Sequence, residues 1–425
     1  MSSLSPSRRG FPLPCYVPHS NPMATTSNKK MASPSPMPDM PDQLLAEIFL
    51  RLPTPQDLAR ASAVCTTFRR ISTDRSFLRC FRCLHAPPLL GFLDRDGFHP
   101  ALPSTPAVRA VAAAADFTFS FLPHHRRWTV QDVRDGRVLL SRSTGKLGQP
   151  PVFRDLAVCD PLHRRYVLLP PLPHDLAALL GHPFPEACCK RFLVPLGEEE
   201  AAAGDTTFRV ILMAYCKTSL ATFVFSSSND HWRATASKDL SDLALDEGDM
   251  EEMSRVQPFF PMRHYAYGCF YWDWVQFGMK KLLLLDTTNM EFSAADLPPG
   301  EWSKEGIAIV EAGEGRLGIF GFRGELASSL SYTTARTKGE SPSQWQMEKT
   351  ISLDSGYKYC IRDATQRYLL LTRIEASSLN NHLVGYFSMD IKTLQLQRVY
   401  EKQHYSNQTY TYINFPPSLL SSRRI

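Results

Sequence analysis

The chain has 425 residues, of which 43% are hydrophobic and 21% are charged, so it is long enough for one large domain and a smaller module. Its net charge of +5 comes from the two ends of the chain, where the basic residues are Arg8, Arg9, Lys29, Lys30, Arg423 and Arg424. The near-neutral remainder predicts no nucleic-acid partner, and the absence of a long uncharged apolar run predicts no membrane helix.

Residues 1 to 36 are rich in Ser and Pro, contain no Asp or Glu, and show no apolar periodicity. Such a segment cannot offset the entropy lost on ordering, so the sequence predicts a disordered tail over residues 1 to 37. The tail lacks the apolar core of a secretory signal. Its acid-poor, Ser-rich composition also fits an organellar transit peptide.

Residues 38 to 84 have the spacing of short amphipathic helices. The apolar residues of the first helix recur at one-, three- and four-residue steps, namely Leu44, Leu45, Ile48, Phe49 and Leu52. Pro41 and Pro53 bracket that helix. Thr54, Pro55 and Asp57 then form the N-terminal cap of a second helix. The apolar residues of the second helix, of a third segment and of the anchor after it are Leu58, Ala61, Val64, Cys65, Phe68, Ile71, Phe77 and Leu78. Three helices are predicted.

So short a helical module buries little apolar surface alone, and a partner is expected to cover the rest. The pattern resembles an F-box, a family that docks on the Skp-type adaptor of a cullin ubiquitin ligase. The positions that match the docking residues of the family are Pro41, Leu44, Ile48, Leu52, Pro53, Leu58, Val64, Cys65 and Phe68. Met40, Thr66 and Phe68 depart from the usual leucine, basic residue and tryptophan. A generic helical hairpin without an adaptor is the alternative.

Beyond Leu84 the sequence changes to short β-prone runs separated by Gly, Pro, Asp and Asn. The best candidates lie at 117–122, 137–140, 166–169, 208–213, 221–225, 265–271, 281–285, 307–310, 317–322, 330–333, 345–348, 368–371, 384–389 and 394–399. At roughly four strands a blade, about twenty such runs predict five to six blades of a β-propeller. A large β-sandwich array is the alternative. The predicted fold class is therefore α+β, with a small three-helix F-box and a large all-β domain over residues 85 to 420.

Three segments of this domain, 158–173, 282–300 and 386–400, repeat one pattern of two strands joined by an aspartate-containing turn. Asp160, Asp286 and Asp390 are placed to bond turn amides. The domain also resembles the propeller-like associated domain of a large grass F-box family. The matching segments are GCFYW (268–272), GEGRLGIFGF (313–322), WQMEKTISL (345–353) and INFPPSL (413–419). The resemblance implies plant origin and this architecture, and it names no target.

The last β-prone run, residues 409 to 415, alternates in polarity and ends at two prolines that cannot continue a ladder. Propellers commonly close by pairing one chain end with a blade begun at the other, which removes an open edge. We therefore expect this run to pair with strands from the first third of the β domain, near residues 117 to 133.

No motif nominates a catalytic residue, a cofactor or a metal site. Gly313, Gly315 and Gly318 have the spacing of a dinucleotide-binding loop, but the residues after them read as a strand, so a β-turn is predicted. Cys80 and Cys83 lack the second close pair of a structural zinc site. The ten cysteines of a chain without a secretory signal are expected to be reduced thiols.

One aromatic cluster is dense enough to suggest an interface, and its members are Tyr265, Tyr267, Phe270, Tyr271, Trp272 and Trp274. Strand alternation divides it between two faces, so core packing is the preferred interpretation.

The sequence thus predicts a non-catalytic substrate receptor of a ubiquitin ligase, located in the cytoplasm or nucleus. Its F-box would bind the adaptor, and through it a cullin, while the β domain would bind a target protein that the sequence does not identify. The alternatives are a regulatory protein that binds the adaptor outside a ligase and an enzyme built on a propeller.

Overall fold

The computed structural model describes residues 40–124, 128–142, 153–180, 189–195, 207–216, 218–243, 245, 247–249, 251, 262–274, 279–324, 329–336, 345–375, 383–403 and 408–414. The predicted tail, Phe415 and most of the INFPPSL segment lie outside these residues. In the described part of the chain, no helix has both the length and the apolar character needed to cross a membrane.

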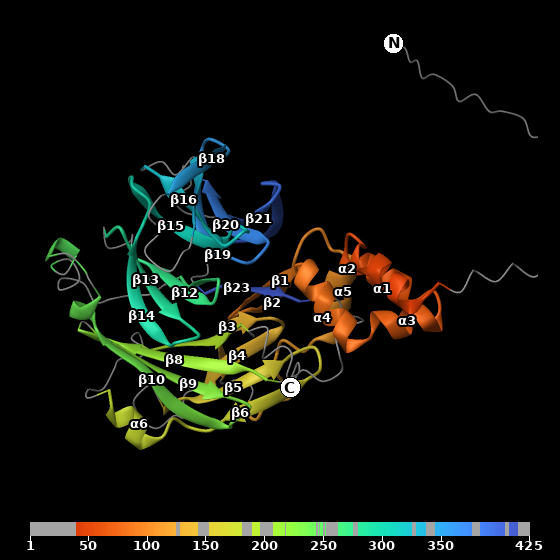
Figure 1. Ribbon diagram of the computed structural model, residues 1–425, viewed down its shortest axis with the longest axis horizontal. Coiled ribbons are helices and arrows are strands. Elements are labelled where there is room, and N and C mark those ends of the chain that lie inside the picture. Colours follow the sequence, from red (N-terminus) through yellow and green to blue (C-terminus); the bar gives the residue numbers. More distant parts are fainter. Residues whose placement is uncertain are drawn as a thin grey trace, which may run out of the picture. The chain divides into compact units, whose positions relative to one another are not determined.

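The helical segment contains α1 (Asp42–Leu50), α2 (Pro55–Ser62), α3 (Thr66–Ser72) and α4 (Arg75–Leu84) (Figure 1). The predicted cap of α2 is present, because the Thr54 hydroxyl accepts a hydrogen bond from the Asp57 amide at 3.2 Å and donates to its carboxylate at 2.6 Å. The sequence predicted three helices, whereas this segment contains four. Asp74 accepts from the amides of Ser76 and Phe77 and so begins a fourth helix where only an apolar anchor was expected.

The core of this segment is formed by Leu45, Phe49, Leu58, Ile71, Phe77, Leu78 and Phe81. Phe49 makes edge-to-face contacts with Phe68 at 5.0 Å and with Phe77 at 6.4 Å between ring centroids. The Nε2 atom of His85 lies 2.8 Å from the Leu50 carbonyl oxygen, one of the acceptors that the end of α1 leaves without an intrahelical partner. The chain after α4 thus fixes the end of α1.

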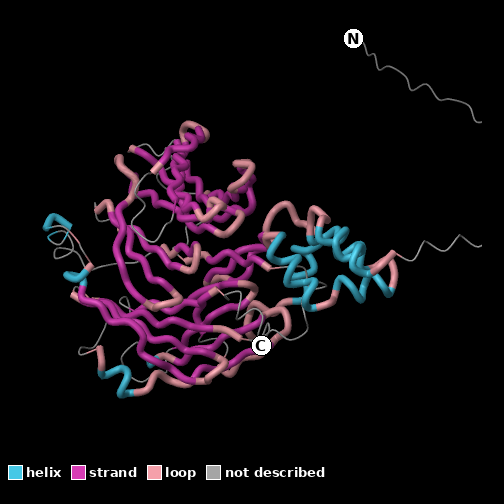
Figure 2. The backbone as a smooth tube through the Cα atoms, viewed as in Figure 1, coloured by secondary structure: helices cyan, strands magenta, loops and turns pink. Residues whose placement is uncertain are grey.

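The all-β part is a six-blade propeller of antiparallel sheets, drawn in magenta in Figure 2. The first two four-stranded blades are β3 (Trp128–Arg134), β4 (Arg137–Arg142), β5 (Asp155–Asp160) and β6 (Arg165–Leu169), then β7 (Cys189–Val194), β8 (Arg209–Tyr215), β9 (Ser219–Ser226) and β10 (His231–Asp239). The third is β11 (His264–Ala266), β12 (Cys269–Asp273), β13 (Lys281–Asp286) and β14 (Glu291–Asp296). The fourth is β15 (Trp302–Glu311), β16 (Arg316–Arg323), β17 (Ser329–Arg336) and β18 (Gln346–Ser352). The fifth is β19 (Tyr357–Ala364), β20 (Tyr368–Glu375), β21 (Val384–Asp390) and β22 (Leu396–Lys402).

The sixth blade closes the ring and, in the described part of the chain, has three strands, in the order β2 (Gly97–Pro100), β1 (Leu89–Asp94) and β23 (Tyr410–Ile413) (Figure 1). Short helices α5 (Pro106–Ala114) and α6 (His174–Ala178) and a 3₁₀ turn at Leu240–Asp242 lie in connections. Neighbouring blades contact one another, since β23 contacts β3, β3 contacts β7, β11 contacts β15, and β15 contacts β19. This arrangement removes the open sheet edge that an unclosed array would leave.

Closure by the C-terminal run is confirmed, and its partner strand lies in the first third of the β domain as predicted, but not near residues 117 to 133. β23 pairs with β1, while its contact with the predicted region is through side chains, as when the Tyr410 hydroxyl donates to the Val130 carbonyl at 3.4 Å. The predicted strand at 117–122 is wrong. Asp116 accepts from the Thr118 and Ser120 amides and holds this segment in turns, although its phenylalanines alternate as in a strand.

The other predicted runs each fall on an observed strand, except that 265–271 is a hairpin of β11 and β12. Tyr267 and Gly268 occupy its turn with φ of 46° and 79°. The repeated aspartate turns are confirmed. Asp160, Asp286 and Asp390 each accept two backbone amides in the turn between the third and fourth strands of a blade, at 2.7–3.2 Å.

Candidate functional site

Helix α1 carries two apolar stripes, of which one is buried and one is exposed. Leu45 and Phe49, four residues apart, face the core of the helical segment. Leu44 and Ile48 have the same spacing but remain 50% and 47% exposed. Scattered exposed apolar residues are common, whereas two on one stripe of a nine-residue helix leave a continuous apolar surface.

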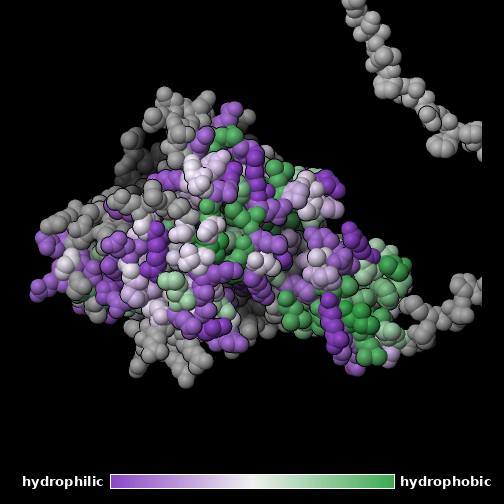
Figure 3. Space-filling view, turned by 90° about the horizontal axis from the view of Figure 1, so that it is seen from above, coloured by the Kyte–Doolittle hydropathy of each residue, from purple (hydrophilic) through white to green (hydrophobic). Residues whose placement is uncertain are grey.

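The turn between α2 and α3 adds a second exposed apolar site. Val64 is 71% exposed, and Cys65 beside it is also exposed. The Cys65 thiol accepts from the Phe68 amide at 3.4 Å and so caps α3. Figure 3 shows apolar residues gathered over the helical part of the surface. These residues fit contact with a protein partner better than contact with water.

The residues predicted to contact the adaptor divide into three groups by exposure. Pro41, Leu44, Ile48, Pro53, Val64 and Cys65 are exposed, and Leu52 and Phe68 are half-buried against the helical core. Leu58 is 0% exposed, so the prediction of a direct contact there needs correction. Its side chain fills the core beneath the exposed stripe, and its role is to hold α2 in place.

An ion pair joins the two helices that flank this surface. Arg70 of α3 donates to the Asp42 carboxylate at the start of α1 at 2.7 Å. Both side chains are more than half exposed, so the pair contributes little stability and mainly orients α1 on α3.

In the β domain, the aromatic cluster is mostly core, as preferred from the sequence. Phe270, Tyr271, Trp272 and Trp274 are buried between blades. Tyr267 is partly exposed at its turn, where its amide donates to Glu311 at 2.8 Å and its hydroxyl accepts from the Gly313 amide at 3.2 Å. Gly313 and Gly315 lie in the turn between β15 and β16 with φ of 81° and 67°, so the predicted β-turn is confirmed.

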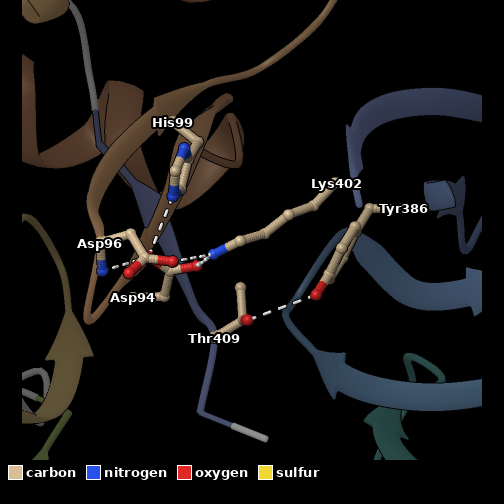
Figure 4. Close-up of polar contacts among 6 residues, drawn as sticks. All are labelled: Asp94, Asp96, His99, Tyr386, Lys402 and Thr409. Carbon is tan, nitrogen blue, oxygen red and sulfur yellow. Dashed lines mark hydrogen bonds and ion pairs between the residues drawn. The ribbon is translucent and has the colours of Figure 1, made fainter. Parts of the chain in front are cut away.

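A polar cluster at the seam between the fifth and sixth blades was missed from the sequence (Figure 4). Lys402 of β22 donates to Asp94 of β1 at 2.7 Å and also to Asp96, while the Nε2 atom of His99 lies 2.9 Å from Asp94. Burial alone would raise the pKa of Asp94, but the bonds from Lys402 and His99 hold that pKa below its ordinary value. Lys402 and Asp94 are 308 positions apart, so no local pattern could pair them.

Among the described residues, no group of three or more His, Cys, Asp and Glu side chains is arranged to hold a metal ion. Cys80 of the CxxC pair is an exposed free thiol there.

The F-box-like family model matches residues 37–84. No curated protein matches the chain. Solved structures that it resembles include a putative 6-phosphogluconolactonase from Bacteroides fragilis, at 12% identity over 63% of this chain and 68% of that one, with a TM-score of 0.31. A putative 6-phosphogluconolactonase from Bacteroides uniformis has 10% identity over 63% and 69%, with a TM-score of 0.32. A mutant of AofleA from Arthrobotrys oligospora has 10% identity over 68% and 75%, with a TM-score of 0.30.

Proposed function

We propose that this chain is the substrate-recognition subunit of a Skp-cullin-F-box ubiquitin ligase. Its helical segment would dock on the Skp-type adaptor, and its propeller would bind the target protein. The observation that carries the proposal is the exposed apolar stripe of Leu44 and Ile48, which lies inside the segment that matches an F-box.

The docking surface is proposed to consist of the exposed and half-exposed members of the predicted set, namely Pro41, Leu44, Ile48, Leu52, Pro53, Val64, Cys65 and Phe68. Burying the exposed halves of Leu44 and Ile48 would release water from apolar surface without disturbing the core below. Leu45, Phe49 and Leu58 keep that core packed whether or not a partner is bound. The surface is therefore preformed, which lowers the entropic cost of docking.

The chain itself would perform no covalent step in this proposal. A propeller offers a rigid platform, and the chemistry would be carried by the ubiquitin-charged enzyme bound elsewhere on the ligase. Holding the target on the same assembly raises the effective concentration of its lysines near that enzyme.

Reconstitution from purified components tests the proposal. The full chain, a Skp-type adaptor and a cullin should co-elute in size-exclusion chromatography. Changing both Leu44 and Ile48 to Ala should release the chain while it stays folded. Co-elution with the adaptor but exclusion of the cullin would instead favour the regulatory alternative, and no adaptor binding at all would contradict the F-box function.

A further inference from the structure

Among the described residues, the sixth blade has no fourth, outer strand, and two apolar side chains on the outer strand of the neighbouring first blade are exposed. In the part of the chain that the structure describes, five blades have four strands, whereas the sheet of β2, β1 and β23 has three. Helix α5 packs on β1 and β2 through Ala107, Val108 and Val111. Phe117 stacks on Phe98 at 4.0 Å between centroids.

The uncovered surface belongs to β6, the outer strand of the first blade. Tyr166 and Leu168 pair with Cys159 and Ala157 of β5, which are fully buried in the core between these two blades. Directly paired residues lie on the same face of a sheet, so Tyr166 and Leu168 point toward the sixth blade as well. They are nevertheless 39% and 48% exposed. Phe121, 6.2 Å from the Tyr166 ring, gives only partial cover.

Two other outer strands bury side chains that face the preceding blade. Trp232 of β10 and Phe292 of β14 are both buried. Exposed outer strands also commonly carry charged side chains that disfavour pairing with another chain, as Glu348 and Lys349 do in the middle of β18. β6 has no charged residue after Arg165, where its sequence continues Tyr-Val-Leu-Leu. An unguarded apolar edge of this kind favours strand addition by another chain.

The charge at the start of the strand indicates which segment would fit. Arg164 and Arg165 are both exposed there. The nearest carboxylate along the chain, Asp160, is buried and bonded to His163 at 2.7 Å. Within the described residues neither arginine forms an ion pair, so the start of β6 presents positive charge beside two apolar side chains.

We propose that β6 is a docking edge for an extended segment of the target protein. The segment would pair with β6 along its backbone, place apolar side chains at alternate positions on Tyr166 and Leu168, and end in an acidic residue beside Arg164 and Arg165. The inference rests on the proposed function only in taking the occupant to be a ligase target.

A displayed library of random short peptides, panned on the full chain, tests the proposal. Peptides with alternating apolar residues and a terminal acid should be enriched. Leu168→Lys should weaken their binding about tenfold or more, while Met347→Lys, at a somewhat more exposed apolar position on β18, should leave it unchanged. Thermal melting would show that both variants fold.

A charge-reversed chain carrying Arg164→Glu and Arg165→Glu gives an independent test, and it should enrich basic residues in place of acidic ones. Enriched peptides that bind wild type and Leu168→Lys equally, or a library that yields no alternating pattern, would overturn the proposal. If the full chain formed a dimer and Leu168→Lys dissociated that dimer, the result would overturn the proposal in favour of self-association. Adaptor binding measured on the same samples tests the proposed function separately, because Leu44 and Ile48 are unchanged in these variants.

Discussion

Replacing both Leu44 and Ile48 with Ala should weaken adaptor binding without unfolding the helical segment. Full burial of a Leu or Ile side chain is worth about 1.5–3 kcal/mol. About half of each side chain is still exposed here, so a partner can gain roughly 1 kcal/mol from each, or about 2 kcal/mol together. That corresponds to a dissociation constant raised roughly 30-fold. Alanine keeps the helix propensity of α1, so its stability should change little.

Isothermal titration of the full chain with a purified Skp-type adaptor measures this effect. The matched control changes Leu168 and Met347 to Ala, since these side chains of the β domain have similar exposure. A contrasting variant, Leu58→Ala, removes a fully buried side chain and should lower the free energy of unfolding by about 2–5 kcal/mol. An affinity of the Leu44 and Ile48 double variant within twofold of wild type would refute the reasoning, as would an equal loss in the control.

Three further predictions concern the rest of the chain. Deleting residues 1 to 36 should leave adaptor affinity unchanged in the same titration, because nothing in their composition suggests a folded role. Deleting residues 408 to 425 removes β23, and soluble yield and a cooperative melt of the β domain should be lost while adaptor binding by residues 38 to 84 persists. Lys402→Met should lower the melting temperature near neutral pH. Because the pKa of Asp94 is lowered in the folded state, its contribution is complete above its ordinary value of 3.8 and is lost as pH falls through the lowered pKa. The difference from wild type should therefore shrink in acid, and a constant difference would contradict this role.

Local signals in the sequence correctly predicted those elements that are stabilised by hydrogen bonds between neighbouring residues. Thr54, Pro55 and Asp57 predicted the start of α2, and the structure forms both bonds of that cap. The aspartate turns were predictable for the same reason, since a carboxylate and the amides two and three residues later need no distant partner.

Tertiary packing decided what the sequence could not. The phenylalanines at 117–122 alternate like a strand, yet the sixth blade places Phe117 on Phe98 and Asp116 folds the segment into turns. The spacing of the apolar residues also predicted adaptor contact for both Leu44 and Leu58. Only the packing of α3 and α4 shows that Leu58 is core and Leu44 surface.

Affinity capture of the full chain from cells under proteasome inhibition tests the central claim most directly, when wild type is compared with the Leu44 and Ile48 double-alanine variant. The proposed function predicts that wild type captures a Skp-type adaptor and a cullin. The variant should lose both, while proteins bound by the β domain are retained and their ubiquitylated forms fall. Capture of the adaptor without a cullin, or of both equally by the variant, would contradict it.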